Sequence, residues 1–150
     1  MATPFATLLS GIVPNGWLNN QDPATGQDML NISTALALRP KSFRFQSKPT
    51  ATANFIDTFV ESTTIPANFA GTKVVALTAA TATTTFTVKT SIQGAGATTL
   101  GTIAISSAGV VTLSTQAAVT LNPGDSIIIT TPAQDATLAD VCITIPATLA

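Results

Sequence analysis

From Ser42 onward, the sequence is a series of short segments in which apolar and polar residues alternate. A period of two is typical of strands with one buried face, because successive side chains of a strand point to opposite sides of the sheet. In Leu138–Ile145, the residues expected to face one way are Val141, Ile143 and Ile145. The other predicted strands are Ser42–Ser47, Asn54–Ile65, Lys73–Thr78, Thr84–Ile92, Leu100–Ser106, Val110–Ser114, Ala117–Leu121 and Ser126–Thr131.

Turn residues separate these segments. Gly94–Gly96 and Ser107–Gly109 each lie between two alternating runs, which is a hairpin signal. Asn122–Asp125 reads NPGD and places Pro and Gly at the two central positions of a type II turn. Many short strands with regular turns predict an all-β domain, a β-sandwich or jelly-roll-like fold, over residues 41–150.

Charge is scarce in this sequence. Charged residues make up 9% of it and hydrophobic residues 45%, whereas an average globular domain has about 25% charged residues. A surface with few ions loses little free energy when another protein covers it, and interface cores are depleted of charge. The composition therefore predicts a surface that contacts other protein; the alternative is an ordinary extracellular-type β domain.

Four of the six basic residues form one loose cluster, Arg39, Lys41, Arg44 and Lys48, in a chain of net charge −1. Such a cluster could contact nucleic acid or an acidic partner, but basic side chains also protect strand edges from pairing. We favour the protective role, because nucleic-acid binding needs a broader basic face. No nucleic-acid partner is expected.

Cys142 is the single cysteine, so no intramolecular disulfide is expected, and its alternating context predicts a small buried apolar residue. No apolar run approaches the ~20 residues of a membrane span, so no membrane partner is expected. The first residues lack the basic region of a signal peptide, and we therefore expect synthesis in a cytoplasm.

Residues 1–40 differ from the rest and are predicted to form an extended N-terminal arm for anchoring or assembly. Proline and glycine interrupt every periodic pattern in residues 1–26. Trp17 is either a lid on the domain's own core or an anchor in a neighbour's pocket, where Trp is enriched. Residues 30–38 fit a strand and also a helical face, and the strand is favoured. The candidate partner-binding residues of the arm are Phe5, Leu8, Leu9, Ile12, Val13, Trp17 and Leu18.

Catalytic groups are few. The sequence contains no His, which removes the commonest general base and metal ligand. Asp57 and Glu61 would lie on one face of a strand but about 13 Å apart, too far for a retaining glycosidase pair. Asp125, Asp135 and Asp140 lie near predicted turns and could form a weak Ca²⁺ site, although turn hydrogen bonding is favoured. We expect no enzyme, no catalytic residue, no resident metal and no cofactor.

Four stretches carry a resemblance: residues 64–72 (TIPANFAGT), 84–89 (TTFTVK), 100–105 (LGTIAI) and, above all, 121–145 (LNPGDSIIITTPAQDATLADVCITI). Through these stretches, residues 48–150 resemble a β-sandwich module of tailed-bacteriophage structural proteins, which is found in tail fibres, tail tips and capsid-surface proteins. The resemblance implies a virion component without catalytic residues that forms a homo-oligomer, usually a trimer.

An arm and one domain suit a capsid decoration or cement protein better than a tail fibre with a long shaft. We expect such a protein to bind the major capsid protein or another virion protein and to stabilise the shell. It would be made in the cytoplasm of a host bacterium and then reside in the virion. The alternative is a short tail fibre or tail-tip adhesion module that binds a host glycan. A glycan depolymerase is disfavoured by the missing His and the spacing of the acids.

Overall fold

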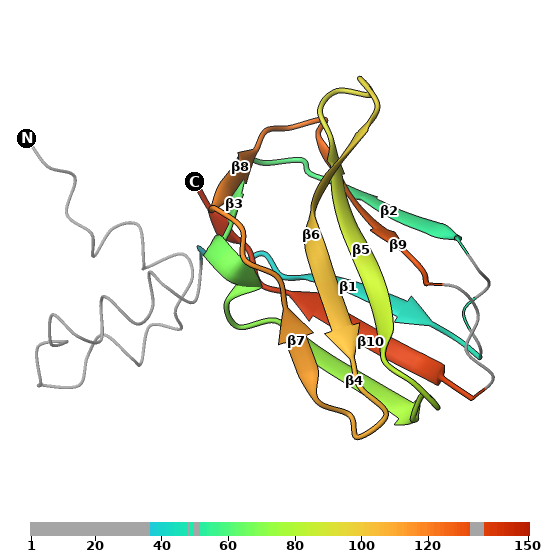
Figure 1. Cartoon of the computed structure of the whole chain (residues 1–150). Helices are drawn as coiled ribbons and strands as arrows, with labels where there is room; N and C mark the ends of the chain where they lie inside the picture. The colour runs from blue at the N-terminus through green and yellow to red at the C-terminus, as the bar shows by residue number, and fades with distance from the viewer. Residues whose placement is uncertain (1–36, 48, 50–51, 133–136) are drawn as a thin grey trace, which may run out of the picture. The chain divides into compact units, whose positions relative to one another are not determined.

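Almost all regular structure in the computed structural model is β-strand (Figure 1), as the alternating pattern predicted. The residues described are 37–47, 49, 52–132 and 137–150. Their elements are β1 (Lys41–Phe45), β2 (Asn54–Thr58), β3 (Thr63–Ile65), the 3-10 helix η1 (Ala67–Phe69), β4 (Lys73–Thr78), β5 (Thr84–Ser91), β6 (Ala97–Ile105), β7 (Val111–Leu113), β8 (Val119–Leu121), β9 (Ser126–Thr130), β10 (Ala139–Ile145) and β11 (Thr148–Leu149).

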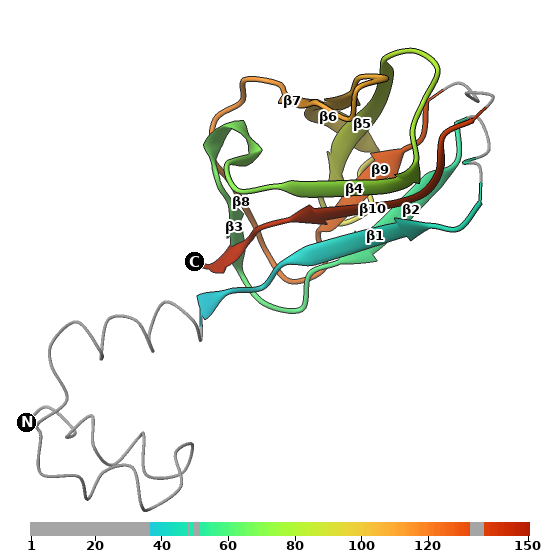
Figure 2. The same cartoon turned by 90° about the horizontal axis from the view of Figure 1, so that it is seen from below.

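The strands form three antiparallel sheets, with the orders β1-β10-β4, β2-β9-β5-β6-β7 and β11-β3-β8. Figure 2 shows β4, β10 and β1 side by side in one layer, with the strands of the five-stranded sheet behind them. The small third sheet lies at the end where β3 and β8 are labelled (Figure 1). The fold is therefore an all-β sandwich-like domain, as predicted.

The core fills the space between the two larger sheets. Alternation places Phe86 and Val88 of β5 inside, and the predicted inward residues of β10 are likewise buried. Burying a side chain of this size stabilises the fold by about 1.5–3 kcal/mol relative to exposure. The largest buried side chains are Phe59, Phe69, Phe86, Ile65, Ile103, Leu121, Ile127, Ile129, Leu138, Ile143, Ile145 and Val88.

The predicted turns are confirmed. Gly94–Gly96 joins β5 to β6 and Ser107–Gly109 joins β6 to β7, and both strand pairs are antiparallel neighbours. In Asn122–Asp125, the Asp125 N–H donates to the Asn122 carbonyl (3.0 Å), and Gly124 has a φ of 93°. That positive φ favours glycine. This turn leads from β8 of the small sheet to β9 of the five-stranded sheet.

The prediction of one strand over Asn54–Ile65 is wrong. The chain pairs with β9 in β2 and with β8 in β3, so it changes sheets between them. At the change, the Phe59 N–H donates to the Asp125 carbonyl (2.8 Å) and the Phe59 carbonyl accepts from the Gly124 N–H (2.9 Å). These bonds to a distant turn replace the local ladder, because buried backbone groups need partners.

Strand pairing within the described residues begins before Lys41. Leu38 forms a bridge with Thr148, and the Arg39 N–H donates to the Ala147 carbonyl (2.7 Å). Residues 37–150 make up one compact unit. Within the part of the chain that the structure describes, no helix has the length and hydropathy needed to cross a bilayer.

Candidate interaction surfaces

The sandwich has two long sides, and on one of them side chains of β1 and β2 close the gap between the sheets. The Phe45 ring meets the Phe55 ring edge-on, with 4.5 Å between centroids. Along the same strands, Lys41 Nζ lies 3.1 Å from Asp57 Oδ2. We call this the closed side, because contacts within the chain join its two edge strands.

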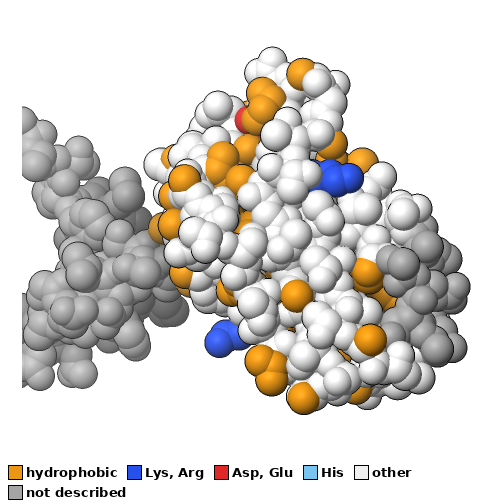
Figure 3. Space-filling view, in the orientation of Figure 1, with side chains coloured by type: hydrophobic (Ala, Val, Ile, Leu, Met, Phe, Trp, Pro, Cys, Tyr) orange, Lys and Arg blue, Asp and Glu red, His pale blue; other side chains and the backbone are white. Residues whose placement is uncertain are grey.

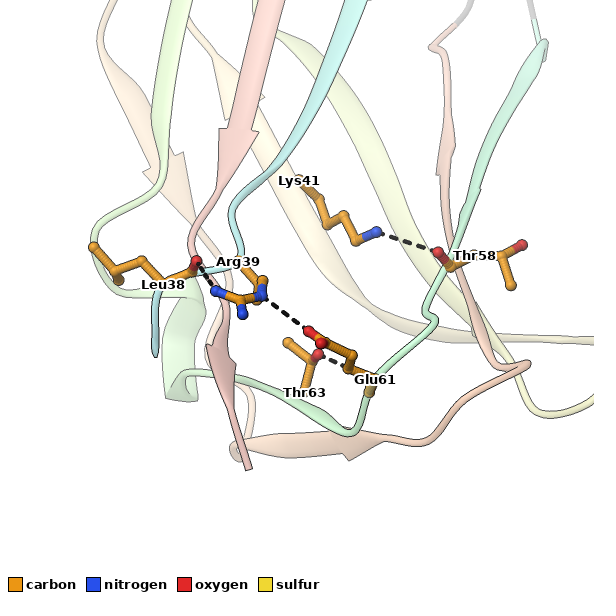
Figure 4. Close-up of polar contacts among 6 residues, drawn as sticks. All are labelled: Leu38, Arg39, Lys41, Thr58, Glu61 and Thr63. Carbon is orange, nitrogen blue, oxygen red and sulfur yellow. Dashed lines mark hydrogen bonds and ion pairs between the residues drawn. The ribbon is translucent and has the colours of Figure 1, made fainter. Parts of the chain in front are cut away.

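Polar contacts extend the closed side toward the start of β1. Lys41 Nζ donates to the Thr58 carbonyl (3.2 Å) and lies 4.5 Å from the centroid of the Phe59 ring. Beyond it, Arg39 Nε lies 2.9 Å from Glu61 Oε2 (Figure 4). Two members of the predicted basic cluster, Arg39 and Lys41, are thus held in ion pairs. Arg44 is exposed, and Lys48 lies outside the described residues.

The opposite side has β4 as the edge of its sheet, and among the described residues no strand pairs with its outer edge. Val75 and Leu77 point away from the core and are 59% and 79% exposed. Cys142 lies opposite Val75 in the same outward row and is half-buried, so its prediction as a small buried apolar residue is wrong. We call the free edge of β4, with Val75, Leu77 and Cys142, the β4 surface.

Two hollows flank the β4 surface. One, of about 330 Å³, lies over the outward face of the sheet, and Arg44, Leu77 and Cys142 are among its lining residues. The other, of about 230 Å³, lies between β4 and the β6–β7 hairpin, and its lining includes Val75 and Val111. The β4 surface is therefore a recessed apolar side of the domain with few charges.

A second apolar surface lies at one end of the sandwich, where loops 59–62, 92–96 and 122–125 meet; we call it the loop end. Asp125 is buried there, and its carboxylate accepts the N–H groups of Gln93 (3.1 Å) and Asn122 (2.8 Å). The bond from Gln93 joins loop 92–96 to loop 122–125, and the backbone bonds of Phe59 with Gly124 and Asp125 attach the third loop. Val60 is 85% exposed on this end, and Ile92 is also exposed. Figure 3 shows hydrophobic side chains gathered at the top of the molecule, where the β5–β6 turn lies.

The acidic residues in the described ranges are engaged by other groups. Asp57 and Glu61 are in ion pairs, and Glu61 lies in the loop after β2, so the two do not share one strand face as predicted. Asp140 Oδ1 accepts the Ser47 N–H (2.8 Å). The favoured turn role is confirmed for Asp125, while Asp135 lies outside the description.

The described residues contain no group of three or more His, Cys, Asp or Glu side chains placed to hold a metal ion. The predicted partner-binding residues all fall in residues 1–36, outside the described part of the chain: Phe5, Leu8, Leu9, Ile12, Val13, Trp17 and Leu18. Sequence reasoning did not identify the β4 surface or the loop end. Exposed apolar residues within strands and turns give no signal of their own before the fold is known.

Comparison of the chain with protein-family models, with curated proteins and with solved structures finds no match.

Proposed function

We propose that this protein is a structural component of a tailed-phage virion, most specifically a decoration protein that binds the major capsid protein lattice and stabilises the shell. One observation carries the proposal: large apolar side chains are exposed on the β4 surface and the loop end, while the ionic groups beside them are few. The all-β sandwich-like fold agrees with the resemblance of residues 48–150 to phage structural modules.

The physical argument concerns the free energy of covering such a surface. Apolar area removed from water contributes about 25 cal/mol per Å². Burying an ion without a partner costs far more than this gain, so an uncovered charge weakens an interface. At the loop end, Val60 and Ile92 can be covered without desolvating Asp125, which is already buried and hydrogen-bonded. Protein is the partner that fits this surface.

The scarcity of exposed aromatic rings on the described surface favours shell binding over glycan binding. Five of the six described phenylalanines are buried, and Phe55, at 37% exposure, packs edge-on against Phe45. A sugar-binding site would need a ring face open to solvent beside polar groups. The tail-tip alternative therefore rests mainly on Trp17 and Phe5, which lie outside the described residues.

The mechanism combines two attachments. The arm, residues 1–40, would lie along the shell and contribute its apolar side chains, while the sandwich would project from the shell or bridge neighbouring subunits. Any ligand that binds only the assembled shell stabilises it by mass action. Association of the copies as a homo-oligomer, with a trimer expected from the resemblance, raises the avidity of weak contacts. No step in this mechanism needs catalysis or a cofactor.

Particle binding tests the proposal. The full chain is added to phage heads that lack it, and the bound copies are counted by quantitative mass spectrometry after sedimentation. Hundreds of copies per particle, with a raised temperature of shell disruption, are expected. A handful of copies located at the tail would instead identify the adhesion module, and no binding to any particle would overturn both.

Deletion of residues 1–26 tests the arm separately. The truncated chain is expected to keep its β-type circular dichroism spectrum and to lose particle binding. Val60→Lys in the full chain tests the contribution of the sandwich in the same binding assay. The Val60 side chain is exposed, so its replacement leaves the core intact. Undiminished binding of the truncated chain would contradict the arm's role as the anchor.

A further inference from the structure

The edge strands of the sandwich are protected to different degrees. An unpaired edge presents N–H and C=O groups that can pair with another chain, and proteins block it with charges, proline, short strands or covering segments. β1 and β2 are joined by the contacts of the closed side, and β7 has only three residues. β4 has six residues, reads KVVALT, and carries one charge, Lys73, at its start. It is the least protected long edge among the described strands.

The backbone of β4 is suited to pairing. In a strand, the N–H and C=O groups of alternate residues point to opposite sides, and β10 takes up those on one side only. The groups on the other side point away from the sheet. Val75 and Leu77 stand beside them on the outward face, so a pairing strand would gain both backbone bonds and apolar contacts.

We propose that β4 pairs antiparallel with β4 of a second copy of this chain, with Ala76 opposite Ala76 of the second copy. A two-fold axis perpendicular to the sheet relates the strands, so that the outward faces of both sheets stay on the same side. Val75 of each copy then lies opposite Leu77 of the other copy. The same residues form both halves of an apolar cross-strand cluster.

Charge and apolar contact together favour this register over its neighbours. Centred on Ala76, the pairing places Lys73 beyond the apolar pairs, opposite the neutral Ala79 of the second copy. Centred on Val75, it would place each Lys73 opposite a Leu77, and centred on Val74, opposite a Val75. Because an ammonium group loses hydration against an apolar neighbour, these two registers are disfavoured. Centring on Leu77 would also leave Lys73 outside the contact, opposite Thr81, but it would set each Val75 opposite the small Ala79 and lose the Val75–Leu77 pairs.

A single pair of short strands is a small interface. Stable complexes bury roughly 1,200–2,000 Å² in total, and six-residue strands with two exposed side chains each provide less. The pairing is therefore expected to be weak between free molecules. It becomes effective where copies are held close together, because a high local concentration strengthens weak contacts. It joins copies across a two-fold axis, so it is distinct from the trimer that the resemblance implies, and it does not depend on shell binding.

Disulfide trapping tests the register. In the full chain with Cys142→Ser, Ala76→Cys places two thiols on directly opposed residues, within reach of a disulfide. Val74→Cys is the matched control, because the register separates those two residues by four positions, about 13 Å along the strands. Mild oxidation is expected to give at least tenfold more covalent dimer for Ala76→Cys on a non-reducing gel. Equal amounts of dimer from the two variants would overturn the proposal.

A second trap distinguishes the other occupant of this edge, the chain's own N-terminal segment. Ser33→Cys combined with Ala76→Cys, again with Cys142→Ser, would give an intramolecular disulfide if residues 30–36 covered β4. That product without covalent dimer would overturn the proposal; dimer as the main product supports it. Unchanged melting temperatures of the reduced variants show that each is folded.

Leu77→Lys provides a test without cysteine. The substitution sets a lysine opposite Val75 and is expected to lower self-association, measured by sedimentation velocity at high concentration, by at least tenfold. Val60→Lys is the control, because Val60 is as exposed as Leu77 but lies on the loop end. Equal effects of the two substitutions, or no effect of Leu77→Lys, would contradict pairing through β4.

Discussion

The two long sides of the sandwich differ in how their edge strands are covered. On the closed side, Phe45 meets Phe55 and Lys41 meets Asp57, so the gap between the sheets is filled by the chain itself. On the β4 side, the edge strand has no described partner, and Val75 and Leu77 face solvent. The outer edges of β1 and β2 also lack a strand partner among the described residues, so the difference lies in the side chains beside the edges.

The difference indicates that the closed side stabilises the folded domain and that the β4 surface is available for association. Contacts on the closed side contribute to the folding free energy of one molecule, because their partners are in the same chain. Exposed apolar groups on the β4 surface contribute little to the folding free energy, because apolar groups stabilise a structure only when they are removed from water. They contribute to association when another surface covers them. Substitutions on the closed side should therefore change unfolding, and substitutions on the β4 surface should change association.

The largest expected effect is that of Phe45→Ala. This ring is buried and touches the rings of Phe55 and Phe86, at 4.5 and 5.5 Å between centroids. Its removal leaves a cavity and is expected to lower the free energy of unfolding by about 3–5 kcal/mol. Leu77→Ala, the matched truncation on the β4 surface, should change it by less than about 0.5 kcal/mol. Urea unfolding measures both, and similar losses would break the comparison.

Gly101→Ala should have an intermediate effect. A Cβ at this position would lie 2.7 Å from Phe69 Cε2 and against Ser114 Oγ, because the Phe69 ring packs directly on the glycine. Overpacking of this kind costs about 1–3 kcal/mol. The control is Thr99→Ala on the exposed part of the same strand, which should be near neutral. A neutral Gly101→Ala would show that η1 does not pack on β6 as described.

Lys41→Met should have the smallest effect of the three. Methionine keeps most of the side-chain length, so the change removes the ion pair with Asp57 and the cation over the Phe59 ring. A loss of about 1 kcal/mol is expected, because the Asp57 side chain is 44% exposed and solvent screens its pairing. The loss should shrink in 1 M salt. Lys73→Met, at an exposed position, is the control, and an equal loss there would remove the distinction between the sides.

The strands that sequence predicted best are those with one polar face. In β10, Cys142 and Thr144 separate the apolar residues, so the buried face could be assigned before the fold was known. β4 was predicted with its correct bounds, but KVVALT does not alternate, and nothing local shows that Val75 and Leu77 face solvent. Orientation there is set by the register with β10, which is a long-range property.

Long-range contacts also account for the errors. The break after β2 depends on backbone bonds between Phe59 and the 122–125 turn, more than 60 residues away in sequence. Asp125 looked like an ordinary turn residue; that role is confirmed, but its second bond, to Gln93, clamps the loop end and could not be predicted. For the candidate surfaces, the sequence indicated only that the protein surface carries few charges, and the fold shows where the exposed apolar side chains lie.

Hydrogen–deuterium exchange at low and at high protein concentration tests the central claim most directly. About half of the β4 amides, those directed to the free edge, are expected to exchange quickly in dilute protein and to become protected in concentrated protein, while the exchange of the β1 and β2 amides does not change with concentration. Protection of β4 that is complete in dilute protein, or unchanged by concentration, would contradict it.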